Sequence, residues 1–214
     1  MLDPKARVAR ALVVALLLFP CLARAADTAP DASSLYTRDR ISLQVVTGPI
    51  SSTSLIGPDI PDFNYWHTGL RLGWMFTSPK GDGRGLDGNF EALLEFSNAF
   101  VYEGFGDYIG GLSGIIRYNF TSAGSRFIPY VQAGLGFVYT DAYQDETQDA
   151  IGQAFNFFPQ AGAGFRYLLT PNWSLDAEMA FQHISNGGMD ERNDGVNALG
   201  MFVGVTYFWD DVWR

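Results

Sequence analysis

The chain alternates between apolar and polar residues over long stretches, and the clearest stretch is 64–76. Trp66, Leu70 and Trp74 share one side of an extended backbone there, whereas Arg71 falls on the other side. A period of two over about a dozen residues predicts a β-strand with two chemically different faces. The alternation recurs, so we expect eight strands near 39–47, 64–76, 89–98, 107–120, 127–139, 155–168, 173–185 and 197–209.

One face of these strands is aromatic and aliphatic, and the other face carries charges of both signs. The charged face holds Arg71, Glu91, Glu95, Arg117, Arg166, Asp176 and Glu178. Three positive and four negative charges on one shared side are typical of a mutually neutralising network inside a closed lumen.

Alternation alone does not say which face points inward, and a soluble lipocalin-like barrel would have its apolar face inside. Strands of about ten residues, Trp and Tyr near the strand ends and a well-matched charged face favour the inverted, membrane arrangement. No apolar run of about 18 residues follows the first 26 residues, so no transmembrane helix is expected. The predicted fold is all-β: an eight-stranded antiparallel transmembrane β-barrel of the outer membrane, with a lumen filled by side chains.

Residues 1–26 are expected to be a secretory signal peptide. A basic segment precedes the apolar run 11–19, and Ala23 and Ala25 supply the small residues before the cleavage site. A lipoprotein signal with Cys21 as the acylated residue fits less well, because Phe and Pro stand where small residues are needed.

The rest of the chain divides into a short flexible lead-in, 27–38, and a barrel domain, 39–214. Residues 1–25 hold four basic residues and one acidic residue, so cleavage changes the net charge from −9 to −12. A polyanion argues against a nucleic-acid partner. Without Cys21 the mature chain has no cysteine, so disulfides and thiol chemistry are excluded.

A periplasmic N-terminus and an even number of strands place both ends of the barrel in the periplasm. The loops after the odd-numbered strands then face outward, and they span 48–63, 99–106, 140–154 and 186–196. The 140–154 loop contains four acidic residues, for which a solvated loop is favoured over a site for divalent cations: Asp141, Asp145, Glu146 and Asp149.

His183 and Ser185 are polar residues on the otherwise apolar face of the seventh predicted strand, at its outer end. Parity places both on the apolar face, where polar side chains are costly unless they lie at the interface or have a task. Asn197 starts the apolar face of the last strand, and the hairpin 186–196 brings it back beside His183.

A hydroxyl, an imidazole and an amide that converge in this way are typical of an acyl-transfer nucleophile with its base and orienting group. The plain alternative is an interfacial pair, because Ser and His two residues apart are a weak motif. His67 points into the lumen by its parity and is expected to hydrogen-bond within the polar network.

Two segments, His-Ile-Ser-Asn-Gly-Gly at 183–188 and Asn-Asp-Gly-Val-Asn at 193–197, resemble the signature of the lipid A 3-O-deacylases. This is the PagL family of acyloxyacyl-hydrolase-like outer-membrane β-barrels. The likeness extends over the mature chain in strand number and in Gly-Leu-Arg-Leu-Gly at 69–73.

The resemblance implies that Ser185 is the nucleophile and His183 the general base, with Asn186 and the Gly188 backbone N–H stabilising the oxyanion. The family's acid, a Glu, falls on Asn197, which can orient the imidazole but cannot stabilise its charged form. In serine proteases the change from Asp to Asn costs about four orders of magnitude in turnover. Three carboxylates of the adjoining loop stay open as substitutes: Asp190, Glu191 and Asp194.

The function implied is an outer-membrane esterase that removes an ester-linked acyl chain, 3-O by resemblance, from lipid A of lipopolysaccharide. Its site would face the lipid of the outer leaflet, and acyl transfer of this kind requires no metal and no organic cofactor. The rival is a non-enzymatic structural or adhesin-type barrel with an impaired triad. The acyl position and chain length preferred, and whether two barrels form a homodimer, stay open.

Overall fold

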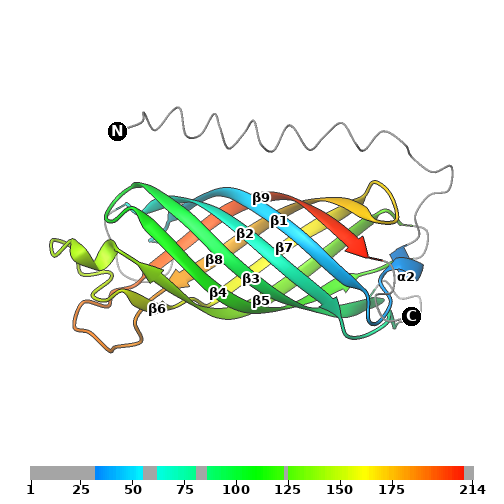
Figure 1. Cartoon of the computed structure of the whole chain (residues 1–214), viewed down its shortest axis with the longest axis horizontal. Helices are drawn as coiled ribbons and strands as arrows, with labels where there is room; N and C mark the ends of the chain where they lie inside the picture. Colours follow the sequence, from blue (N-terminus) through cyan, green and yellow to red (C-terminus); the bar gives the residue numbers. More distant parts are fainter. Residues whose placement is uncertain (1–31, 55–61, 81–85, 123–124, 210–214) are drawn as a thin grey trace.

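The computed structural model describes residues 32–54, 62–80, 86–122 and 125–209, so the expected signal peptide lies outside the described residues. The chain forms a closed antiparallel β-barrel, in which neighbouring strands pair and the last strand pairs with the first (Figure 1). Among the residues described, no helix is long and apolar enough to cross a membrane. The elements are α2 (Ala32–Leu35), β1 (Ile41–Ser52), β2 (Asn64–Met75), β3 (Gly88–Glu103), β4 (Tyr108–Phe120), β5 (Phe127–Thr140), η2 (Ala142–Gln144), β6 (Phe155–Phe157), β7 (Gln160–Leu168), β8 (Trp173–Ile184) and β9 (Val196–Trp209).

β6 and β7 are two parts of one wall strand, so the barrel has the eight strands that the alternation predicts. Both parts pair with β5 in one register, since Phe157 lies opposite Phe137 and Gln160 opposite Gly134. Pro159 separates them because it has no backbone N–H to donate to the ladder.

Two strands run further outward than predicted, because β1 continues to Ser52 and β3 to Glu103. The predicted strand 39–47 stops before Gly48-Pro49, a pair that is common in turns. In the structure a Cβ at Gly48 would collide with the Met201 carbonyl, and the pairing of β1 with β9 skips both positions. Glycine and proline therefore fit a close approach within the wall here, instead of a turn.

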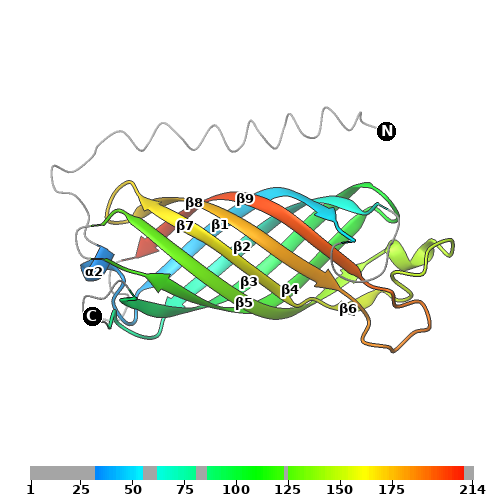
Figure 2. The ribbon, with the colours of Figure 1, turned by 180° about the vertical axis from the view of Figure 1, so that it is seen from behind.

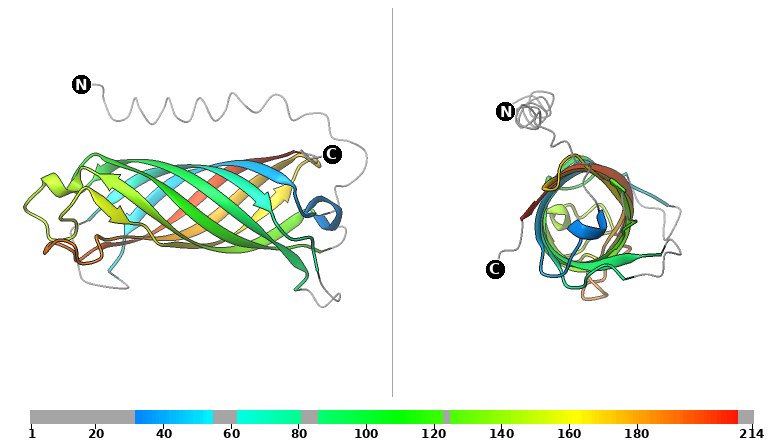
Figure 3. Two further views of the ribbon diagram at one scale, coloured as in Figure 1. Left: turned by 60° about the horizontal axis from the view of Figure 1, so that its bottom comes forward. Right: turned by 90° about the vertical axis from the view of Figure 1, so that its right-hand side faces the viewer.

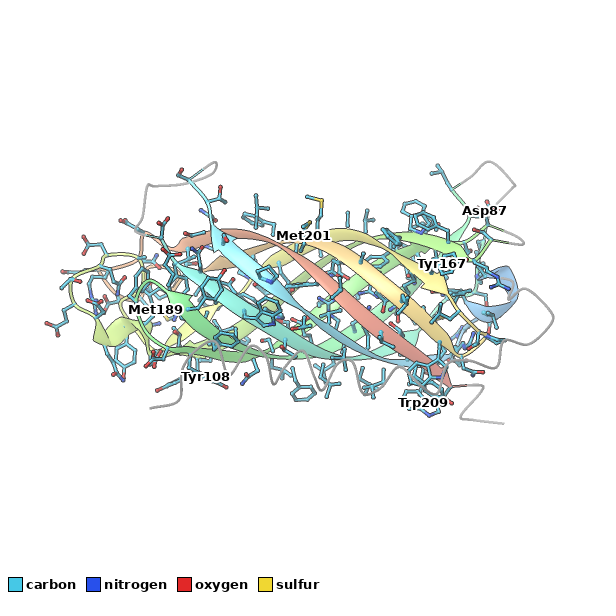
Figure 4. The ribbon with its side chains drawn as sticks, turned by 90° about the horizontal axis from the view of Figure 1, so that it is seen from above. Asp87, Tyr108, Tyr167, Met189, Met201 and Trp209 are labelled. Atoms are coloured by element: carbon cyan, nitrogen blue, oxygen red, sulfur yellow. The ribbon has the colours of Figure 1, made fainter. Side chains whose placement is uncertain are left out.

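The exterior of the barrel is apolar and its lumen is polar, as predicted. Trp74 on β2 is 46% exposed, whereas Arg71 on the opposite face is fully buried. Tyr108 lies toward one end of the barrel, Tyr167 and Trp209 lie toward the other, and Met201 lies between them (Figure 4). This distribution is typical of aromatic girdles at the two interfaces of a membrane.

The seven charged residues predicted for the lumen are all buried. Arg71 lies 2.6 Å from Glu95 and 2.7 Å from Glu178, and Arg166 lies 2.8 Å from Glu91. Buried charges need partners at this range. His67 also points into the lumen, as its parity predicts. The predicted hydrogen bond of this histidine is not formed at its Nε2 atom. This atom has no hydrogen-bond partner among the described residues, and the ring stacks on Phe202 at 5.0 Å.

The end of the barrel opposite the long loops is closed by residues that the sequence assigned to a flexible lead-in. α2 lies across this opening when the barrel is viewed along its axis (Figure 3). Arg40 donates hydrogen bonds to the carbonyls of Leu35 and Pro171, at 2.6 and 2.7 Å. The described part of the lead-in is therefore a plug, and its apolar contacts are made by Ala32, Tyr36, Met75, Ile128, Leu168 and Phe208.

Candidate active site

His183 lies at the outer end of β8, directly opposite Asn197 of β9. Its side chain is on the exterior face with Phe181, whereas Gln182 and Ile184 are buried on the lumen side. Nδ1 of His183 lies 2.7 Å from Oδ1 of Asn197. Because a carbonyl oxygen only accepts, Nδ1 carries the proton and Nε2 presents a lone pair. Asn197 therefore selects the tautomer that a general base requires.

Ser185 follows on the same exterior face, and its backbone is fixed by β6. Its N–H donates to the Phe157 carbonyl at 3.2 Å and its carbonyl accepts from Phe157 at 2.8 Å. Two residues along a strand span about 6.6 Å, so Ser185 and His183 are neighbours on this face. In the described part of the chain the Ser185 hydroxyl makes no hydrogen bond. Catalytic hydrogen bonds between a nucleophile and its base are often long or absent before substrate binds.

The loop after Ser185 is organised around the buried side chain of Asn186. Its Oδ1 accepts from the backbone N–H groups of Gly188 and Met189 at 2.9 and 3.0 Å, and its Nδ2 donates to the Arg192 carbonyl at 3.0 Å. The two groups predicted as oxyanion donors are thus hydrogen-bonded to each other in this arrangement. The sequence motif did not reveal that Asn186 holds the loop together.

Asn193 is a polar group of the site to which the sequence reasoning gave no role. Its Oδ1 accepts from the backbone N–H of Asn186 at 2.7 Å. Since that oxygen is the acceptor, Nδ2 is a donor held close to the backbone of the Ser185-Asn186 pair. No spacing rule identifies this contact, which depends on how the 186–195 loop folds back.

The His183 ring also packs against Gly195, whose φ is +74°. A Cβ added at Gly195 would lie 2.9 Å from Cε1 of His183. The ring is therefore held by a hydrogen bond on its Nδ1 side and by backbone beside Cε1, and only glycine leaves room for it.

None of the three loop carboxylates forms a hydrogen bond or an ion pair with His183 among the described residues. Asp190 accepts from the Arg192 backbone N–H at 2.9 Å, Glu191 is exposed, and the Asp194 backbone donates to Asp149. Within the described ranges no group of three or more His, Cys, Asp and Glu residues could hold a metal ion. Of the candidates for the third position, Asn197 is the one that is hydrogen-bonded to His183 in the described part of the chain.

The 186–195 loop and the 141–154 segment project from the same end of the barrel (Figure 2). Two backbone hydrogen bonds help to join them, because the N–H groups of Asp194 and Gly195 donate to the carbonyls of Asp149 and Ala150 at 3.0 Å. The candidate site therefore lies at the outer end of the β8–β9 wall, beside two long loops that are hydrogen-bonded to each other.

The family model described as lipid A 3-O-deacylase (PagL) matches residues 66–206, more than half of the chain. The chain belongs to this family. It is thus an ester hydrolase of the outer membrane, in agreement with its barrel.

The chain is also similar to individual proteins of known structure or function. The lipid A deacylase PagL of Pseudomonas aeruginosa is 24% identical over 191 residues, which cover 88% of this chain and 97% of the relative. The crystal structure of the outer membrane enzyme PagL matches with a TM-score of 0.55 and 20% identity, over 75% of this chain and 97% of that one. Neisserial surface protein A (NspA) matches with a TM-score of 0.54 and 16% identity, over 78% and 96%. At these identities the two structures show a shared fold alone.

We expect Gly195→Ala to reduce the activity of this deacylase by about tenfold to a hundredfold, because a displacement of about 1 Å can cost that much. The added methyl group pushes on the His183 ring, and the left-handed backbone adds roughly 1–2 kcal/mol of strain. Gly114→Ala is the control, since Gly114 lies on the exterior of β4 and its Cβ would meet nothing within 4 Å. Hydrolysis rates that fall equally in both variants would contradict the packing argument.

Proposed function

We propose that this deacylase removes an ester-linked acyl chain, the 3-O chain, from lipid A, with Ser185 as nucleophile and His183 as general base. Asn197 is the third member of this triad and orients the imidazole of His183. The observation that carries the proposal is the 2.7 Å contact between His183 Nδ1 and Asn197 Oδ1, on the same exterior face as Ser185.

The chemistry follows from the tautomer. Nε2 of His183 accepts the proton of Ser185 Oγ as the oxygen attacks the acyl carbonyl, and a tetrahedral intermediate forms. Its collapse breaks the ester bond, and the imidazolium returns the proton to the departing lipid A hydroxyl. Water then repeats the sequence on the acyl-enzyme and releases the fatty acid.

We assign oxyanion stabilisation to the loop that follows the nucleophile. The Gly188 N–H would exchange its bond to Asn186 for the developing oxyanion, while Asn186 continues to hold the loop. Nδ2 of Asn193 is a second donor, because its partner oxygen is already fixed by the Asn186 backbone at 2.7 Å. Donors that are preorganised in this way are among the largest contributions to acyl transfer.

A lipid-facing position suits this substrate. Phe181, Met179 and Leu199 continue the exterior face from the site toward the middle of the wall, and the last two are well exposed. Acyl chains can lie against this apolar surface while the ester remains at the head-group boundary. The lipid then reaches the nucleophile without leaving the outer leaflet.

The deciding experiment is to incubate the refolded mature protein with lipopolysaccharide and to measure the mass of lipid A. We expect the loss of one hydroxyacyl chain, and no loss with Ser185→Ala. Unchanged lipid A with the folded wild-type protein would favour the non-enzymatic barrel, for which the replacement of the family's Glu by Asn197 is the motivating observation.

A further inference from the structure

The 141–154 segment is a compact platform beside the site. Gln148 is buried within it, and its Nε2 donates to the carbonyls of Ala142, Asp145 and Ile151 at 3.2, 2.9 and 2.8 Å. Its Oε1 accepts from the Ile151 N–H at 2.8 Å. The platform is anchored to the barrel through apolar contacts of a cluster that includes Ala142, Ala150, Ile151, Phe158, Ile184 and Val196.

Arg192 extends into this platform from the 186–195 loop, which is called the catalytic loop below. Its Nη1 donates to the carbonyls of Asp145 and Gln148 at 3.0 and 3.4 Å, and its Nη2 donates to those of Tyr143 and Gly152 at 3.0 and 3.4 Å. Four backbone carbonyls thus occupy the two terminal nitrogens of one guanidinium. These donors are committed to the protein and are not presented to a phosphate of the substrate.

The backbone of Arg192 connects the same residue to the nucleophile. Its carbonyl accepts from Nδ2 of Asn186, which directly follows Ser185, and its N–H donates to Asp190. Most residues between Asn186 and Arg192 are exposed. The loop also contains three glycines with positive φ values: Gly187, Gly188 and Gly195. A loop with several glycines has little rigidity of its own, so its position depends on its hydrogen bonds, and the Arg192 side chain contributes four of them to the platform.

We propose that Arg192 is a positioning residue of the deacylase: its guanidinium locks the catalytic loop onto the platform and so sets Ser185, Gly188 and Asn193 in place. The inference rests on the proposed function, because it assumes Ser185 as nucleophile. It adds that the 141–154 segment is part of the catalytic machinery, although it holds none of the reacting groups.

The fork geometry of the side chain matters for this role. A guanidinium presents donors from rigid, separated nitrogens and can serve several carbonyls at once, whereas a lysine offers three donors from a single point. Arg192→Lys should therefore retain part of the hydrogen bonding to the platform carbonyls. Arg192→Gln has two donors and no charge, so it should lose most of that hydrogen bonding.

We expect Arg192→Gln to lower kcat by about tenfold to a hundredfold through misplacement of the loop. KM should stay within about twofold, because no contact with the substrate is removed. Arg192→Lys should fall between Arg192→Gln and the wild type. Amide hydrogen exchange in micelles should accelerate at Asp194 and Gly195, whose N–H groups donate to the platform. The control is Arg38→Gln, which removes the same charge from a side chain 66% exposed at the other end of the barrel.

Three outcomes distinguish a failure of the positioning role of Arg192 from a failure of the proposed function. Wild-type kcat in Arg192→Gln, with Ser185→Ala inactive, would overturn the positioning role alone. A raised KM with unchanged kcat would do the same and would identify Arg192 as a substrate contact. Full activity in Ser185→Ala would refute the proposed function, and the positioning role with it. Heat-modifiable migration on gels establishes that each variant is folded, and if Arg192→Gln does not fold, the rates of Arg192→Lys decide.

Discussion

Replacing Ser185 or His183 with alanine should abolish ester hydrolysis, with a loss of about 10⁴-fold or more in kcat. Without Ser185 no acyl-enzyme can form, and without His183 no base takes the proton of the hydroxyl. The barrel should remain folded, because both side chains lie on the exterior at a strand end. Surface substitutions of this kind usually change the free energy of unfolding by about 0.5 kcal/mol or less.

The measurement is the rate of fatty acid release from lipopolysaccharide in micelles, beside heat-modifiable migration as a test of folding. Ser51→Ala is a suitable control, since Ser51 is an exposed serine near the outer end of β1. It should hydrolyse at the wild-type rate. If Ser185→Ala or His183→Ala also kept that rate, another group would have to be the nucleophile or the base.

The strands could be predicted because the two faces of the wall meet different media. Each residue of the charged face needs a partner inside the lumen, so Arg71 and Glu95 occur at lumen positions of neighbouring strands and pair at 2.6 Å. The limits of the strands were harder to predict, because Gly48 and Pro49 are turn residues in isolation. Their place in the wall depends on the close approach of β9, which the local sequence does not specify.

The plug was missed for a related reason. The segment 27–38 is mostly small and polar, so its composition suggests a flexible lead-in. A single aromatic residue changes the outcome, since Tyr36 is fully buried against the end of the lumen. Composition averages over a segment, whereas packing depends on individual side chains.

The placement of the candidate site followed from parity. His183 and Asn197 could be placed opposite each other because a hairpin fixes which residues of its two strands meet. The roles within the loop could not be predicted in the same way. Asn186 and Asn193 form hydrogen bonds within the folded loop, and Arg192 forms them with the 141–154 platform, so none of these contacts follows from spacing along the chain.

Asn197 makes the site unlike that of a deacylase with a Glu at this position. The amide holds the imidazole as a carboxylate would, with Oδ1 2.7 Å from Nδ1. It contributes no negative charge to stabilise the imidazolium of the proposed mechanism. Orientation is therefore preserved and charge stabilisation is lost, and these two contributions can be separated by substitution.

Asn197→Glu should raise kcat, because a carboxylate restores charge stabilisation of the His183 imidazolium. Asn197→Leu should lower kcat by about 10²-fold or more, since the ring loses the acceptor that selects its tautomer. The rates of fatty acid release should therefore rank Glu above Asn and Asn above Leu. Asp190→Asn and Asp194→Asn are the controls, and both should be nearly silent because neither carboxylate contacts His183 among the described residues. If Asn197→Leu were silent and either loop variant inactive, a loop carboxylate would hold the third position during turnover, and the observed contact with Asn197 would belong to the resting enzyme alone.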